Sequence, residues 1–145
     1  MLENLTNLVK QYAGDAIINN PAIPNEKNDE VVSDASNSIF DGLKNVVSGG
    51  NVSDITNLFN GGGDAAASSA VSQNIQSGFV QNLMNKFGLD QGKAASIAAG
   101  LIPTVMQKLV HKTNDSNDSS FNLAGIIGSL TGGGGVMDKL KGMFN

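Results

Sequence analysis

Two residue types that many enzymes and binding proteins depend on are missing from this sequence. Cysteine is absent, which excludes disulfide bonds, thiolate metal sites and a cysteine nucleophile. Arginine is also absent, since every basic residue is a lysine, and arginine is the side chain that binds phosphates, carboxylates and guanine edges with a planar fork. With a net charge of −4 and no basic stripe, the chain is not expected to bind nucleic acid.

Side chains suited to catalysis are scarce as well. The single histidine, His111, lies near the end of an expected helix beside Lys108 and Lys112, where the negative end of the helix favours a basic residue. A catalytic histidine needs an orienting carboxylate and a nucleophile, and the nearest carboxylate, Asp115, falls in a polar loop. Most other carboxylates stand at helix caps or on polar faces, so the sequence predicts a protein that is not an enzyme.

Motifs for metal or phosphate binding are incomplete. Residues 115–120, DSNDSS, resemble the start of a calcium loop, but the positions that need glycine and glutamate hold Ser120 and Ile126. The glycine runs at 61–63 and 132–135 lack the lysine and the preceding strand of a phosphate-binding loop, and are expected to be flexible helix breaks. No cofactor, metal or small-molecule ligand is therefore predicted.

Long apolar runs are missing too. No stretch approaches the roughly 18 apolar residues of a membrane span. Residues 1–12 are polar every few positions and lack the apolar segment of a signal peptide. We therefore expect a cytoplasmic protein.

Apolar residues recur at spacings of three and four along almost the whole chain, which indicates amphipathic helices, and no stretch alternates with a period of two. The sequence therefore predicts an all-α fold, a bundle of six to seven helices with glycine-rich breaks. Pro21 and Pro24 end the first helix because proline cannot continue it. The expected helices span residues 2–18, 31–47, 52–59, 66–87, 91–111, 121–130 and 136–144.

The helices over 66–87 and 91–111 are expected to pack antiparallel at the centre of the fold. Gly88 suits the left-handed residue that follows a helix, and Asp90 suits the N-cap of the next one. Pro103 should kink the second helix because it removes one backbone hydrogen bond. The positions expected to be buried between and around these helices are Leu83, Phe87, Ile97, Leu101 and Val105.

One short pattern occurs twice, at a constant offset of 71 residues. Each copy is a capped two-turn helix followed by a glycine run. Either the chain is built from two related helical halves, or the match is a coincidence in a sequence rich in glycine and asparagine. The matching residues are Asn51, Val52, Ile55, Phe59 and Gly61 to Gly63 in the first copy, and Asn122, Leu123, Ile126, Leu130 and Gly132 to Gly134 in the second.

Residues 87–112, FGLDQGKAASIAAGLIPTVMQKLVHK, combine a Gly-Leu-Asp helix break, a small-residue helix and a Leu-Ile-Pro step. Together with the later segment LAGIIGSLTGGGG, they resemble the YidB-like bacterial proteins and the related glycine-rich bacterial domain of unknown function. The resemblance implies a helical, bacterial protein without assigned catalytic residues. On this basis the chain divides into an N-terminal helical arm with a proline-containing linker, residues 1–30, and a helical YidB-like domain, residues 31–145.

The short apolar helices carry the functional prediction. A helix of two turns is unstable alone, so each must dock on its own chain or on another copy. We expect a non-catalytic structural or interaction protein that forms a homo-oligomer through apolar helix faces, while packing within one chain would satisfy the same residues. The candidates for self-association are Leu2, Leu5, Leu8, Val9, Tyr12, Ile126, Ile127, Leu130, Met137, Leu140 and Phe144.

The alternative function is that of a peripheral membrane-surface or lipid-associated module that uses residues 121–144. This segment combines apolar residues and glycines with Lys139 and Lys141 on the far side of its last expected helix. Binding to anionic lipid usually needs more positive charge than this, so the interaction protein is the favoured interpretation.

Overall fold

The structure is a computed structural model, and it describes residues 2–48, 52–115 and 123–130. Within these ranges there is no β-strand, and the predicted all-α fold is confirmed. The expected helix over 136–144 lies outside the described residues. The elements are α1 (Leu2–Tyr12), the π-helical turn η1 (Gly14–Ile18), the 3-10 turn η2 (Asn25–Lys27), α2 (Asn28–Ser48), α3 (Val52–Asn60), α4 (Gly63–Ala67), α5 (Ala70–Phe87), α6 (Gln91–Thr113) and α7 (Leu123–Leu130).

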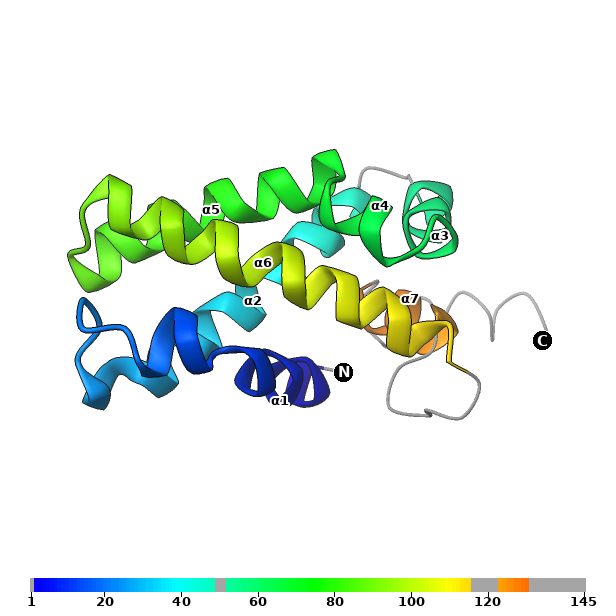
Figure 1. Cartoon of the computed structure of the whole chain (residues 1–145). Coiled ribbons are helices and arrows are strands. Elements are labelled where there is room, and N and C mark those ends of the chain that lie inside the picture. The colour runs from blue at the N-terminus through cyan, green and yellow to red at the C-terminus, as the bar shows by residue number, and fades with distance from the viewer. Residues whose placement is uncertain (1, 49–51, 116–122, 131–145) are drawn as a thin grey trace.

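Four helices form a closed ring of neighbours around one hydrophobic core. Helix α1 packs on α2, α2 on α5, α5 on α6, and α6 back on α1. In Figure 1, α6 runs between α5 and α1, while α3, α4 and α7 gather at one end. Contacts of α3 with α6 and α7, and of α7 with α2, join these shorter helices to the ring.

Helix α6 contributes nine buried residues to the core. They recur at spacings of three and four and form one apolar stripe, which meets α1, α3, α4 and α5 along its length. An apolar stripe of this kind is stable only when other elements cover it. The buried residues of α6 are Ala94, Ile97, Ala98, Leu101, Ile102, Val105, Met106, Leu109 and Val110.

The predicted turn between the two central helices is confirmed. Gly88 adopts a left-handed conformation with φ of +69°, and the amide of Leu89 donates to the carbonyl of Leu83 at 3.2 Å. Asp90 caps α6, because its side chain accepts a hydrogen bond from the amide of Lys93 at 2.8 Å. The turn between α5 and α6 is therefore determined by residues within the turn itself, Gly88 and Asp90, which can be recognised in the sequence.

Most of the expected core positions of the central pair are buried. Leu83, Ile97, Leu101 and Val105 are at most 2% exposed. Phe87 differs, since it is only partly buried and packs against the edge of the core. Its place as the last residue of α5, beside the turn, explains why one side of the ring stays open.

The expected helix over 66–87 is wrong at its start, because the structure divides it into α4 and α5. Helix α4 ends at Ala67, and Ser69 is the N-cap of α5. The hydroxyl of Ser69 donates to the carbonyl of Ala66 at 2.7 Å and accepts from the amide of Ser72 at 3.1 Å. A serine at an N-cap satisfies a backbone donor that has no partner within the helix. This local cap breaks a continuous helical pattern.

The glycine run at 61–63 has a more specific role than a flexible break. Gly62 has φ of +90°, and Gly63 begins α4 directly against α6. A Cβ atom added at Gly63 would lie 2.8 Å from Cγ of Gln107, which is closer than packed side chains come. The absence of a side chain therefore allows α4 to approach α6.

The expected helix over 2–18 is also corrected. Helix α1 ends at Tyr12, and the chain winds again as η1 from Gly14 to Ile18. Ala13 and Ile17 are both fully buried. Glycine has a low helix propensity, and the change of winding at Gly14 turns Ile17 towards the core.

Residues 2–30 contribute directly to the common core, although the sequence suggested an arm. Leu5, Leu8, Val9 and Ile17 are at most 2% exposed, and α1 packs on both α2 and α6. Ile23, in the proline-containing linker, is also buried at 2% exposure. Packing within one chain, which the sequence left open, is thus the arrangement observed for these residues.

The two copies of the internal pattern form helices that lie against each other. Ile55 and Phe59 of α3 are buried, and so are Ile126 and Leu130 of α7, which stand at the matching positions. Helices α3 and α7 are in contact. The matching residues therefore have the same role in packing, while both explanations of the repeat stand.

We predict that Leu8→Ala lowers the free energy of unfolding by about 2–5 kcal/mol, because it leaves a cavity in the core. The matched control is Asn7→Ala at the neighbouring exposed position of α1, which should change the free energy by no more than about 0.5 kcal/mol. Denaturant unfolding of both variants measures the difference. Equal midpoints would show that α1 is a detachable arm.

Candidate functional site

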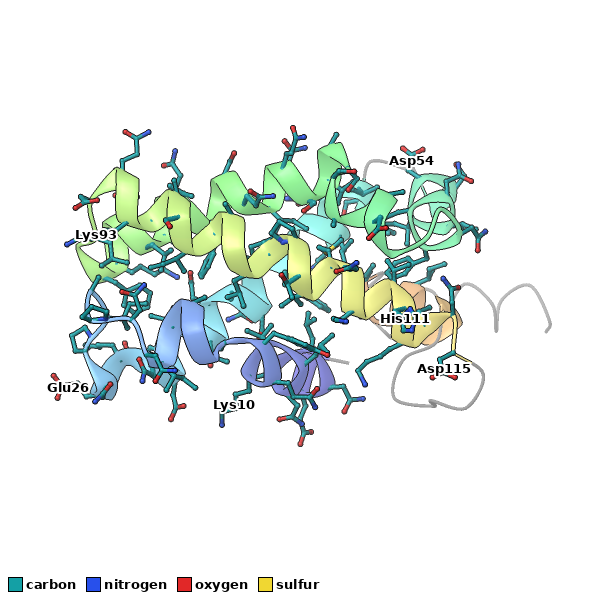
Figure 2. The ribbon with its side chains drawn as sticks, viewed as in Figure 1. Lys10, Glu26, Asp54, Lys93, His111 and Asp115 are labelled. Atoms are coloured by element: carbon teal, nitrogen blue, oxygen red, sulfur yellow. The ribbon has the colours of Figure 1, made fainter. Side chains whose placement is uncertain are left out.

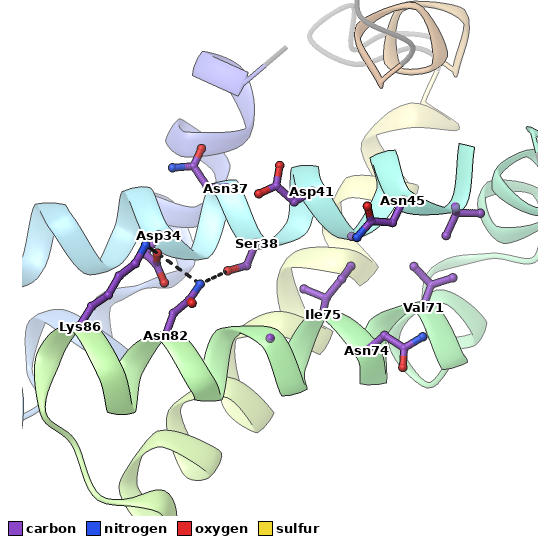
Figure 3. Close-up of a pocket in the computed structure, with 13 residues that line it drawn as sticks. Asp34, Asn37, Ser38, Asp41, Asn45, Val71, Asn74, Ile75, Asn82 and Lys86 are labelled. Carbon is purple, nitrogen blue, oxygen red and sulfur yellow. Dashed lines mark hydrogen bonds and ion pairs between the residues drawn. The ribbon is translucent and has the colours of Figure 1, made fainter. Parts of the chain in front are cut away.

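A groove with a volume of about 740 Å³ lies between α2 and α5 (Figure 3). One face of each helix lines it, and most of the lining side chains are polar. Asparagine is the commonest residue type among them. The lining residues are Asp34, Asn37, Ser38, Asp41, Gly42, Asn45 and Val46 of α2, and Val71, Asn74, Ile75, Gly78, Asn82 and Lys86 of α5.

The two helices run antiparallel along the groove, and their contacts fix which residues lie opposite each other. Asn82 contacts Ser38 at one level, and Gly42 lies against Ile75 further along, one turn away on α2 and two turns away on α5. Residues four apart along a helix share one face. This register gives three levels across the groove: Asn37 opposite Asn82, Asp41 opposite Gly78, and Asn45 opposite Asn74.

Two glycines shape the groove in different ways. A Cβ atom added at Gly42 would overlap Cγ1 of Ile75, so the bare backbone allows α2 and α5 to cross closely at the groove floor. Gly78 has no atom within 4 Å of the place where a Cβ would be, and its missing side chain leaves the middle level open to solvent. The groove is therefore narrow at its base and open above.

A buried carboxylate closes one end of the groove. The side chain of Asp34 is 7% exposed, and its Oδ1 lies 2.9 Å from Nζ of Lys86 and 3.5 Å from Nδ2 of Asn82. Asn82 also donates to the hydroxyl of Ser38 at 3.4 Å. Because a buried charge is costly without a partner, these contacts tie α2 to α5 at this point. Within the described residues, Oδ2 of Asp34 has no hydrogen-bond partner.

The asparagines beyond this network offer unused hydrogen-bonding groups. Asn37, Asn45 and Asn74 are exposed and bond to none of the residues whose positions are described. Each side-chain amide provides one oxygen that accepts and an NH₂ group that donates twice. The groove can therefore donate and accept hydrogen bonds at two of its three levels without any rearrangement of the core.

A smaller hollow continues from the Asp34 end of the groove and is acidic. Asp29 and Glu30 line it, together with Asp34 and Lys86, which belong to both hollows. Lys27 lies 3.5 Å from Glu30, so that carboxylate is partly balanced. With the exposed Asp41 at the middle level, the combined surface carries more negative than positive groups.

Among the residues predicted to mediate self-association, those that the structure describes do not gather on one exposed surface. Those on α1 and α7 that are described lie in or against the core of their own chain. Leu5, Leu8, Val9, Ile126 and Leu130 are buried, and Tyr12 and Ile127 are partly buried. The side chain of Leu2, and Met137, Leu140 and Phe144, lie outside what the structure describes.

The other residues weighed from the sequence lie apart from the groove. His111 is exposed near the end of α6, and Asp115 is exposed two residues beyond that helix (Figure 2). No cluster of three or more carboxylate or histidine side chains suitable for a metal ion occurs in the described part of the chain. None of the described helices combines the length and apolar character needed to cross a bilayer.

The groove is not among the features predicted from the sequence. The repeated spacing of four, at Asn37, Asp41 and Asn45 and again at Asn74, Gly78 and Asn82, is present in the sequence. Polar positions on an amphipathic helix usually face solvent, and that interpretation hid the pattern. Only the antiparallel register of α2 and α5 brings the two sets together.

Comparison of the chain with protein-family models, with curated proteins and with solved structures finds no match. The groove is therefore interpreted from its own geometry.

We predict opposite effects of alanine at the two groove glycines. Gly78→Ala should raise the free energy of unfolding by about 0.5–1 kcal/mol, because the site is open and alanine favours a helix. Gly42→Ala has the same propensity gain but forces Cβ into Ile75, which is buried, at a cost of about 1–3 kcal/mol. Thermal or denaturant unfolding compares the two variants. Equal stabilisation by both would contradict the close crossing at Gly42.

Proposed function

We propose that this chain is a non-catalytic helical interaction protein that binds a partner in the groove between α2 and α5. The observation that carries the proposal is the set of exposed asparagine amides, aligned across an antiparallel helix pair and unused by the fold. These asparagines lie on helices whose other faces are packed, so the backbone positions that carry them are set before any partner binds.

The chemistry of the groove suits binding better than proton transfer. Amide side chains donate and accept hydrogen bonds without gaining or losing a proton near neutral pH. Asp34 is shielded from solvent and is held by Lys86. Asp41, the exposed carboxylate of the groove, stands opposite Gly78, which supplies no side chain that could act with it.

The resemblance to YidB-like proteins stays a prediction, and so do self-association and a bacterial, cytoplasmic origin. The structure bears on which residues could form a contact between two copies. Leu5 and Leu8 are in the core of the single chain, so a second copy would have to exchange α1 with this chain or use another surface. Replacing both by aspartate would place unpaired charges in the core and unfold the chain, rather than release subunits. Membrane binding through residues 121–144 also stays a prediction.

The exposure of Asn74 allows a direct test. A photo-crosslinking amino acid is placed at Asn74 in the full chain and, as a control, at Gln73, an exposed residue on the side of α5 that lines a different hollow, next to α6. We predict a discrete covalent adduct in cells from position 74 and not from position 73. Adding Gly78→Arg, which fills the middle of the groove, should abolish the adduct.

Two results would contradict the proposal. The same adducts from both positions would indicate a contact that does not involve the groove. A position-74 adduct that persists in the Gly78→Arg protein would show that the partner does not enter it. The fold of each variant is checked by circular dichroism, because the proposal requires that Gly78→Arg leaves the helices intact.

A further inference from the structure

The three levels of the groove are spaced regularly along its length. Residues four apart on an α-helix are separated by about 6 Å along the axis, because each residue rises about 1.5 Å. Asn37, Asp41 and Asn45 follow this spacing on α2, and Asn74, Gly78 and Asn82 follow it on α5. The two walls are therefore in step, and the end levels lie about 12 Å apart.

This spacing matches that of an extended peptide. Two residues of a β-strand rise about 6.6–6.8 Å, and two residues of a polyproline II chain rise about 6.2 Å. Over the two intervals of the groove the mismatch is about 1.6 Å or less, which the rotatable side chain of asparagine can absorb. A segment of four or five extended residues spans all three levels.

The chemistry of the walls also matches a peptide backbone. A peptide group has one N–H donor and one carbonyl acceptor. An asparagine side chain can pair with both, because its oxygen accepts a hydrogen bond and its NH₂ group donates one. In an extended chain, the N–H and C=O of alternate residues point to opposite edges. One edge can therefore bond to Asn37 and Asn45 on α2 while the other edge bonds to Asn74 on α5.

The inference rests on the proposed function and deepens it. We infer that the groove binds an extended, basic peptide segment of a partner protein, mainly through hydrogen bonds between its backbone and the asparagine side chains of both walls. The glycine at position 78 leaves room for the chain at the middle level. Specificity for sequence is modest, because backbone groups are common to all peptides.

Charge selects among such peptides. Asp41 is exposed at the middle level, and Asp29 and Glu30 line the hollow beyond the Asp34 end. Lys86 is already engaged by Asp34, so it offers little attraction to an acidic ligand. Lysine or arginine side chains of the bound segment can therefore lie near these exposed carboxylates, of which only Glu30 has a lysine of the described residues within ion-pair distance, Lys27.

A docked helix fits these observations less well. Helix recognition needs an apolar stripe that receives residues at spacings of three and four. The apolar residues of the groove lie around Val46, Val71 and Ile75, towards one end, and the asparagines line both walls. An extended segment uses these amides, whereas a helix has already bonded its own backbone internally.

The test starts from the purified full chain and a random library of displayed heptapeptides. We predict binders rich in lysine and arginine. The best sequence is synthesised with both ends blocked, and its affinity is measured by titration calorimetry. Asn45→Ala and Asn74→Ala should each weaken binding by about threefold to tenfold, as expected for loss of a net hydrogen bond. Gln73→Ala, on the side of α5 away from the groove, is the matched control and should leave the affinity unchanged.

N-methylation of the peptide then tests the backbone bonds themselves. Methyl groups on one set of alternate nitrogens should weaken binding and remove the further effect of Asn45→Ala, while Asn74→Ala keeps its effect. Methylation of the other set should give the reverse pattern. Measuring the affinity with the methyl group, with the alanine substitution, and with both together forms a double-mutant cycle. If the asparagines had only a structural role, the effect of each substitution would not depend on which peptide nitrogens are methylated.

Each alternative outcome overturns the inference. These outcomes are a selection that returns no binder, binders that ignore both asparagine variants, binders that become helical on the protein, and affinity that is insensitive to N-methylation. The photo-crosslinking result is independent of all four. An adduct at Asn74 combined with insensitivity to N-methylation would retain the groove as an interaction surface and exclude an extended peptide as its occupant.

Discussion

The apolar stripe along helix α6 must be buried, and the positions of the neighbouring helices follow from that requirement. Its buried residues extend from Ala94 to Val110, and α1, α3, α4 and α5 each cover part of them. Burial of this apolar surface is the main favourable contribution to folding. The close contact of Gly63 with Gln107 shows how tightly the neighbours approach.

The groove between α2 and α5 results from the way the helices pack. Helix α5 covers α6 with one face and meets α2 with another, where Ile75 and Phe79 are buried. The polar face of α5 is then left beside the polar face of α2. Gly42 sets how closely the helices cross, and the contact of Asp34 with Lys86 sets their register at one end. A partner could therefore bind at the groove without any change in the core.

The parts of the fold that depend on neighbouring residues were predictable, and those that depend on distant contacts were not. Gly88 and Asp90 predicted the central turn, because a left-handed glycine and an N-cap are visible in the sequence. The break at Ser69 and the end of α1 at Tyr12 lie within continuous apolar patterns, which hid them. Burial of Leu8 within its own chain required knowledge of where α2 and α6 lie.

The candidate site was the least predictable feature for the same physical reason. Asn37, Asn45 and Asn74 each satisfy the ordinary pattern of a solvent-facing helix residue. Their relation depends on the register between α2 and α5, which the contacts at Gly42 and Asp34 determine. Spacing along one helix indicates a shared face, but it cannot indicate which face of another helix lies opposite.

The central claim is that the groove walls belong to the same cooperative unit as α6. Native-state hydrogen exchange measures this most directly, because it gives the opening free energy of each amide. The account predicts that amides in residues 37–45 of α2 and 75–83 of α5 exchange only through the opening that also exposes Leu101 and Val105 of α6. Exchange of the α2 amides through a separate, much smaller opening would contradict it, because the groove would then not be preformed.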